Sequence, residues 1–248
     1  TTSAAAQSGW WTVFAQPFDL TQYSLNNYIK VVADRGMGRA FINSVIVTVP
    51  AVILPLAIAS LAGFAFAWMH VPGKRWLLPA FVGLLVVPPQ MAFIPVLRIF
   101  NVVGLTGSYP AVWLAHTAFA LPLMVYLIHN FIAEIPTDII DSASIDGATT
   151  FQVYVFIVLP LSLAAIASLF IFQFIWVWNN LLLALIFLGG ASDVAPMTVR
   201  IASLVGVRGE GWEILTAAAF VSMILPLIIF FGLQRYFVRG MLAGSVKG

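Results

Sequence analysis

Cysteine is absent from this chain of 248 residues, and charged residues make up only 8% of it. The absence of thiols excludes disulfides, thiolate metal sites and cysteine nucleophiles. Three histidines are present, but His70, His116 and His129 lie on separate stretches and share no metal-binding spacing with carboxylates, so no metal site is predicted. The net charge of +2 is too small to indicate a nucleic-acid partner.

Ionisable side chains are also missing from the middle of every long apolar run. Arg98 lies near the end of one run, and no Asp, Glu or Lys occupies the centre of any of them. Ion-coupled carriers keep such groups at membrane depth because the coupling ion must bind something. The chain also lacks the glycine-rich phosphate-binding loop of P-loop ATPases. The energy for any transport is therefore expected to come from another chain.

Apolar residues fill most of the remainder. Hydrophobic side chains account for 62% of the chain, and the mean hydropathy is +1.03. Five stretches are long enough to cross a bilayer as helices, at 40–69, 76–100, 109–133, 151–178 and 214–236. The predicted fold is all-α, a polytopic helical membrane protein with five transmembrane helices. Prolines inside these stretches predict kinks whose freed carbonyls must be bonded by neighbouring helices.

Two other classes of protein remain as alternatives at this point. A self-sufficient channel or secondary carrier is compatible with proline-rich spans, but it should show filter-like or ionisable groups at membrane depth. An intramembrane enzyme needs a nucleophile or a metal set inside the spans, and the scattered histidines argue against one. A subunit that gates a pathway under the control of other chains is the favoured interpretation.

An acidic segment follows the third apolar stretch. Pro136 is expected to end the preceding helix, and Thr137 to cap a new one over 138–145. At helical spacing this new helix is amphipathic. Its acidic face carries Glu134, Asp138 and Asp141, and its apolar face carries Ile135, Ile139 and Ala143.

A turn and a second helix are predicted next. Asp146-Gly147 is a turn signal, and Gly147 is expected to take a positive φ that a larger side chain would resist. Thr149 and Gln152 match a capping box for a helix that runs toward the membrane. A plain connector could be far shorter, so the helix–turn–helix predicts a docking site for something outside the membrane.

The spacing of this segment carries a family resemblance. Asp141-Ser142-Ala143, then Asp146-Gly147-Ala148, then eight residues and Ile157-Val158-Leu159-Pro160, resembles the EAA motif of ABC-importer permeases. Asp141 replaces the usual Glu, and Ser142 replaces the usual Ala. The similarity extends over nearly the whole chain, and its ending at 239–248 resembles the carbohydrate branch of the maltose-transporter type, with α-glucoside permeases nearest. Members of that branch usually have six spans, one more than predicted here.

The resemblance implies a topology and a division of the chain. It implies a multi-pass protein of the bacterial inner membrane, with a periplasmic N-terminal segment at 1–39, a permease domain at 40–239 and a cytoplasmic tail at 240–248. Within the permease domain, the coupling loop at about 134–155 would be cytoplasmic. The loop at about 189–212 would be periplasmic, and an interfacial or re-entrant helix there remains an alternative.

The resemblance also implies partners and roles. The partners would be a homologous second permease, two cytoplasmic ATPase subunits, a periplasmic or lipid-anchored sugar-binding protein, and membrane lipid. No cofactor is expected on this chain, since ATP and Mg would bind the ATPase subunits. The residues expected to couple the chain to an ATPase subunit are Asp141, Ala143, Asp146, Gly147 and Ala148. A second contact, between the two ATPase subunits, is expected from Ala243, Gly244, Ser245, Val246, Lys247 and Gly248.

A pathway for sugar needs polar groups that face the bundle axis, because hydroxyl groups need hydrogen-bond partners. The candidates are Asn43, Gln90, His116, Asn130, Gln173 and Asn179. Each could instead form a hydrogen bond between helices. In the maltose branch the partner permease supplies most sugar contacts, so few of these side chains need to touch the cargo.

Overall fold

Helices make up all the regular secondary structure of the residues that the computed structural model describes, which are 25–34, 36–191, 193–204 and 212–245, with side chains through 235. In chain order the helices are α3 (Asn26–Ile29), η2 (Lys30–Asp34), α4 (Met37–Trp68), α5 (Lys74–Leu84), α6 (Pro89–Val102), α7 (Tyr109–Ala133), α8 (Thr137–Ile145), α9 (Thr150–Val153), η3 (Tyr154–Val158), α10 (Leu159–Leu161), α11 (Leu163–Trp178), α12 (Leu181–Leu188), α13 (Met197–Leu204) and α14 (Trp212–Ser245). The elements η2 and η3 are short π-helices.

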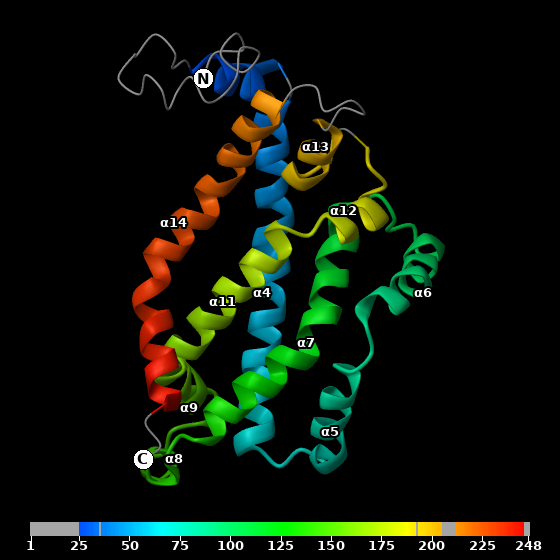
Figure 1. The fold of residues 1–248 in the computed structure, drawn as a ribbon. Coiled ribbons are helices and arrows are strands. Elements are labelled where there is room, and N and C mark those ends of the chain that lie inside the picture. The colour runs from blue at the N-terminus through cyan, green and yellow to red at the C-terminus, as the bar shows by residue number, and fades with distance from the viewer. Residues whose placement is uncertain (1–24, 35, 192, 205–211, 246–248) are drawn as a thin grey trace.

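Helix α4 is the central element of the bundle. It packs along α7 and α11, and α11 packs in turn against α14 (Figure 1). At Gly63 the approach to α7 is so close that a Cβ atom would lie 2.8 Å from Ile128 Cγ2 and 3.0 Å from the backbone nitrogen of His129. A small residue at a helix contact lets two backbones come together, which is how membrane helices gain packing energy without a hydrophobic driving force.

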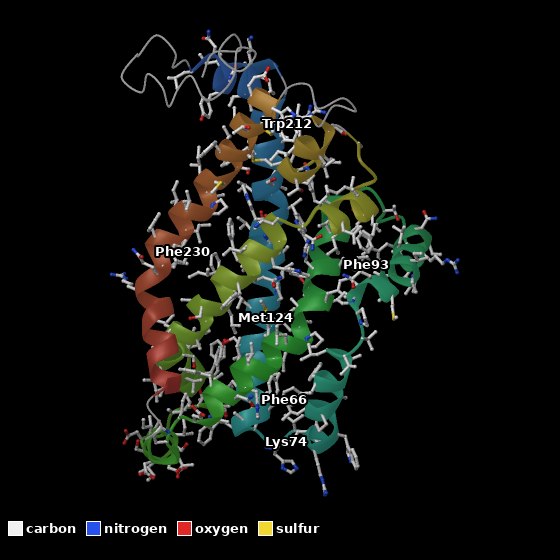
Figure 2. All side chains as sticks on the ribbon, in the orientation of Figure 1. Phe66, Lys74, Phe93, Met124, Trp212 and Phe230 are labelled. Carbon is white, nitrogen blue, oxygen red and sulfur yellow. The ribbon has the colours of Figure 1, made fainter. Side chains whose placement is uncertain are left out.

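The two ends of the bundle carry different elements. Helix α13 lies near the N-terminal end of α4, and α8 lies at the other end of the molecule (Figure 1). Figure 2 shows Phe66 and Lys74 at the end where α4 gives way to α5, Trp212 at the opposite end, and Met124 between them. Phe66 of α4 and Trp212 of α14 therefore lie at opposite ends of the bundle.

The predicted spans are only partly continuous helices. By length and composition, three helices could each cross a membrane alone, namely α4, α7 and the Trp212–Arg235 part of α14, and the count reaches five if each of two bent pairs is one span. The predicted stretch 76–100 is α5 plus α6, which meet at 104°, and the predicted stretch 151–178 bends by 71° before α11. The predicted five spans are therefore reached when each of these two bent pairs counts as one span, and the bends agree with the kinks that the prolines predict.

Proline explains both bends. Pro88 caps α6 and Pro89 is its first residue; neither can donate a backbone hydrogen bond, and each disfavours helix in the residue before it. In the other pair, Pro160 follows the π-helix η3, and the chain turns at Ser162. A π-helical turn next to a proline is a common cause of a sharp kink.

At three prolines inside the long helices, the carbonyl that the proline frees accepts a hydrogen bond from a neighbouring helix. Pro50, Pro55 and Pro226 remove the helical donors of the carbonyl groups four residues earlier, which belong to Ile46, Ala51 and Ser222. Each of these oxygens accepts a side-chain N–H from another helix. The donors are Trp113 Nε1 to Ile46 at 2.9 Å, Gln173 Nε2 to Ala51 at 3.1 Å, and Trp178 Nε1 to Ser222 at 3.0 Å. The expectation that neighbouring helices bond the freed carbonyls is confirmed at these three sites.

Candidate functional site

The segment between α7 and α11 is the helix–turn–helix that the sequence predicts. It lies at one end of the bundle and consists of α8, a three-residue turn at 146–148 and α9 (Figure 1). One detail of the prediction is wrong. Thr137 is the first residue of α8 rather than its cap. The capping position is Pro136, with φ of −57° and ψ of 134°, and its side chain has no polar atom that could bond the helix start. Asp138 lies in the first turn, where a negative charge favours the positive end of the helix dipole.

The turn after α8 has the hydrogen-bond pattern of a Schellman motif. The backbone nitrogen of Ala148 donates to the carbonyl of Ala143 at 3.0 Å, and that of Gly147 donates to the carbonyl of Ser144 at 3.1 Å. Gly147 has the predicted positive φ, at 80°. A Cβ atom at this position would meet nothing within 4 Å. Backbone conformation, and not space, therefore accounts for glycine here.

The capping box of α9 is present as predicted. The backbone nitrogen of Thr149 donates to Gln152 Oε1 at 2.8 Å, and the backbone nitrogen of Gln152 donates to Thr149 Oγ1 at 3.3 Å. Two N–H groups at the start of α9 are thereby satisfied within four residues. The direction in which the chain returns to the bundle is consequently set by local sequence.

Exposure along this segment differs from the predicted faces. The three acids of the motif helix and turn, Asp138, Asp141 and Asp146, are exposed. Ile135 and Ala143 are only 8% and 6% exposed, whereas Ile139 is 38% exposed, so the chain itself covers two of the three residues of the predicted apolar face.

The apolar side chains that stay uncovered lie elsewhere in the segment, and we call them the apolar rim. Its members are Ile139, Ile145 and Phe151 of the segment and Phe156 of η3 just beyond it, with Ile145 86% exposed and the two phenylalanines 70% and 73% exposed. Sequence analysis named only Ile139. No local signal distinguishes the others, because Val153 and Tyr154 of the same stretch are buried.

A shallow hollow joins the turn to the helix that follows. It has a volume of about 330 Å³ and is lined by Asp146, Gly147, Ala148, Gln152, Phe156 and Ile157. Four of the five predicted coupling residues are exposed or half-buried along this segment, whereas Ala143 faces inward. The arrangement presents carboxylates and apolar side chains together, which suits a protein partner with basic and apolar groups.

A contact that the sequence analysis missed fastens this segment to α4. Tyr154, only 9% exposed, packs its ring 5.2 Å from that of Phe64. Its hydroxyl group lies 2.9 Å from Ser60 Oγ, within hydrogen-bond distance. No periodicity signal marks a tyrosine in an apolar run as a bonded residue, because its partner stands 94 positions away in the chain.

Two of the predicted pathway residues form hydrogen bonds between elements. Asn43, 4% exposed, donates from Nδ2 to the carbonyls of Asp193 and Ala195 and accepts from the Tyr109 hydroxyl group. Gln173 is 5% exposed and donates to Ala51 as described above. A polar side chain with these partners stabilises the bundle, whatever else it does.

The other four predicted pathway residues have separate surroundings. His116 is buried edge-on to Trp176 at 4.9 Å between ring centroids, and its Nδ1 has no hydrogen-bond partner among the described residues. Asn179 donates to the carbonyl of Ile175 in its own helix and borders an open hollow of about 270 Å³ that also reaches Thr198 and Ser222. Gln90 and Asn130 are exposed. The six side chains do not converge on one site, and their pathway role stays a prediction.

Three of the six residues of the predicted C-terminal contact fall at the end of α14. The helix runs unbroken across the predicted 239/240 boundary and includes the backbone of Ala243, Gly244 and Ser245. Val246, Lys247 and Gly248 lie outside the described residues. Within the described ranges, no three His, Asp or Glu side chains come together as a metal-ligand group.

Comparison with known proteins gives a consistent result. Residues 40–243 match the model of a family described as "Binding-protein-dependent transport system inner membrane component". The chain is 55% identical to the osmoprotective compounds uptake permease protein GgtD of Synechocystis sp., over 97% of this chain and 80% of that protein. It is 51% identical to the alpha-glucoside transport system permease protein AglG of Rhizobium meliloti, over 92% of this chain and 61% of that relative, which is less than two thirds of its length.

The fold has a counterpart among solved structures. A chain from the crystal structure of a bacterial ABC transporter involved in the import of the acidic polysaccharide alginate superposes with a TM-score of 0.72. The alignment covers 85% of this chain and 79% of the other, at 20% sequence identity. At that identity the likeness concerns the arrangement of helices.

Proposed function

The chain belongs to the family of binding-protein-dependent transport system inner membrane components and is a multi-pass permease subunit of an ATP-driven importer, and from this premise we propose that its cargo is a small uncharged sugar of the α-glucoside class. The sequence identity of 51% to an alpha-glucoside permease supports this class of cargo. The named relative with 55% identity takes up osmoprotective compounds, so the cargo of this chain would be a glucoside that serves that purpose or a close chemical relative.

The charge distribution of the bundle supports an uncharged cargo. Within the described parts of α4, α7 and α11, only Arg39 carries a full charge, and it lies in the first turn of α4. A charged side chain facing the pathway would favour cargo of the opposite charge, because a buried charge is costly unless it is paired. Neutral donors and acceptors, such as amide and hydroxyl groups, recognise sugar hydroxyl groups without that cost.

Energy would enter through the segment of α8, the Gly147 turn and α9. The geometry of this segment is the observation on which the proposal chiefly rests, since a glycine-stabilised helix–turn–helix with exposed carboxylates and the apolar rim fits a docking role outside the membrane. We assign its partner as a cytoplasmic ATPase subunit. ATP and Mg would bind that subunit, and this chain would catalyse no reaction. The end of α14 would make a further ATPase contact.

The opposite end of the bundle would meet the solute-binding protein. The segment 189–212 includes α13, which lies at the end away from α8 (Figure 1). Asn43 and Ser44 of α4 hold the start of α13 and the residues before it, by bonds to Asp193, Ala195 and Met197. A loop fixed to the central helix of the bundle can present a constant surface to a partner.

A second permease would complete the pathway. In its most apolar window α14 is only 11% buried, whereas α7 is 50% buried. The outward side of α14 includes Phe220, Ile228 and Phe231, all more than half exposed. Lipid and a homologous permease are the two surfaces in a membrane that can cover such a side chain.

Reconstitution tests the proposal directly. The complex of this chain with the second permease and the ATPase subunits would be placed in proteoliposomes with the binding protein, and ATP hydrolysis and uptake of radiolabelled α-glucosides would be measured. We expect uptake only with ATP and binding protein, with no uptake of a charged sugar acid. Uptake by this chain alone, without ATPase subunits, would show instead that it is a self-sufficient channel or carrier.

A further inference from the structure

The segment of α8, the Gly147 turn and α9 is attached to the rest of the bundle by one specific side-chain contact at its end. Tyr154 is the first residue after α9, and its hydroxyl group lies 2.9 Å from Ser60 Oγ of α4. The contact is buried, since Ser60 is 4% exposed and Tyr154 is 9% exposed. The ring also packs on Phe64, one helical turn further along α4. A movement of α8 and α9 would therefore be transmitted to α4 through the Tyr154–Ser60 hydrogen bond, which depends on angle as well as distance.

The other end of α4 holds the segment that includes α13. Ser44 Oγ accepts the backbone N–H of Met197, the first residue of α13, at 2.8 Å. Asn43 donates to the carbonyls of Asp193 at 2.9 Å and Ala195 at 3.1 Å. Ser44 and Met197 are 2% and 1% exposed, so water cannot replace this bond.

Between these two attachments, α4 is held at both of its interior prolines. The carbonyl freed by Pro50 accepts from Trp113 of α7, and the carbonyl freed by Pro55 accepts from Gln173 of α11. A proline kink without such partners is a point where a helix can flex. With both carbonyls bonded, a shift at one end of α4 moves the other end instead of being absorbed at the kinks.

We infer that α4 is the element that connects the ATPase-docking segment to the binding-protein-facing segment, with Ser60–Tyr154 and Ser44–Met197 as its two attachment points. The inference rests on the proposed function and deepens it, because it names the residues through which the binding protein at one end would stimulate ATP hydrolysis at the other. These are positioning residues. None of them needs to touch ATP or the cargo.

The test measures the factor by which sugar-loaded binding protein stimulates ATP hydrolysis in the reconstituted complex. Tyr154→Phe keeps the ring on Phe64 and removes only the hydroxyl group, and Ser60→Ala removes the other partner. Ser44→Ala removes the attachment at the far end. We expect each to reduce the stimulation factor by about fivefold, the effect of losing one buried hydrogen bond. Because all three substitutions act on one connection, the stimulation factor of the double variant Ser44→Ala with Tyr154→Phe should be only slightly lower than that of either single variant.

Matched controls separate connection from general damage. Ser168→Ala removes a hydroxyl group that bonds only the carbonyl of Ala164 in its own helix, and Tyr126→Phe removes one from a side chain 37% exposed on α7. Both should keep the wild-type stimulation factor. Assembly is followed by co-purification of the ATPase subunits, and Ser60→Ala serves if Tyr154→Phe assembles poorly.

The outcomes are distinct. A wild-type complex that the binding protein does not stimulate overturns the proposed function and this inference with it. A stimulated wild type with unchanged factors in Tyr154→Phe and Ser60→Ala overturns the inference alone. Losses that multiply in the double variant would also overturn it, since two independent routes would then be at work.

Discussion

Gln173 donates from its side-chain Nε2 to the backbone carbonyl oxygen of Ala51 at 3.1 Å. That carbonyl is the one that Pro55 leaves without a helical donor, because proline has no N–H group. A side chain of α11 thus completes the backbone hydrogen bonding of α4, 122 positions away in the chain. The amide group is buried, so the bond does not compete with water.

Gln173→Leu is expected to destabilise the purified complex by about 1 kcal/mol, since the Ala51 carbonyl loses its donor. In a Pro55→Ala background the new N–H at position 55 can bond the same carbonyl, so the cost of Gln173→Leu should largely disappear. Thermal midpoints of the four proteins in detergent measure the coupling. Gln90→Leu, at an exposed glutamine, is the control. Equal losses from Gln173→Leu in both backgrounds would contradict the account.

Gly63→Ala should separate α4 from α7. A Cβ atom there would lie 2.8 Å from Ile128 Cγ2 and 3.0 Å from a backbone nitrogen, so the helices must shift, at a cost of about 1–3 kcal/mol. Gly83→Ala makes the same change in α5, where a Cβ atom meets nothing within 4 Å. We expect a lower thermal midpoint for the first variant and an unchanged or higher one for the second. The reverse order would contradict the close contact.

Substitutions at Gly147 should grade with their tolerance of positive φ. Asn accepts this conformation readily, Ala pays about 1–2 kcal/mol, and Pro cannot adopt it because its ring holds φ near −65°. Space plays no part, since the position is open. Stimulated ATP hydrolysis in the reconstituted complex should therefore fall in the order Asn, Ala, Pro, with Gly147→Pro losing hydrolysis and uptake together. Full activity in Gly147→Pro would mean that this turn is only a connector.

The apolar rim should decide how firmly the ATPase subunits are held. Ile145→Ser and Phe151→Ser remove apolar surface that is 86% and 70% exposed, so the fold of this chain should be unaffected. We expect ATPase subunits to wash off the purified complex at least several-fold faster, as for the loss of buried interface residues. Val102→Ser, at a residue 88% exposed at the end of α6, is the matched control. Equal retention in all three would remove the rim from the docking surface.

Much of the docking segment could be predicted because its signals are local. The positive φ of Gly147 and the capping box of Thr149 and Gln152 depend on residues within a few positions of one another. Membrane helices are equally readable, since a bilayer demands length and apolarity from each stretch separately. The assignment of Thr137 as a cap failed because a neighbouring proline can occupy the capping position without providing a capping side chain.

By itself, then, the sequence determined that this chain is a helical membrane protein with a glycine-stabilised turn outside the spans. Only the tertiary structure decided that two of its apolar stretches bend by 104° and 71°, that Ala143 is covered, and that Ser60 meets Tyr154. Proline predicts the kinks but not their angles, and the Ser60–Tyr154 contact joins residues 94 positions apart in the chain. Their geometry depends on how whole helices pack, and no pattern within a single stretch specifies which donor of a neighbouring helix will reach a carbonyl that a proline has freed.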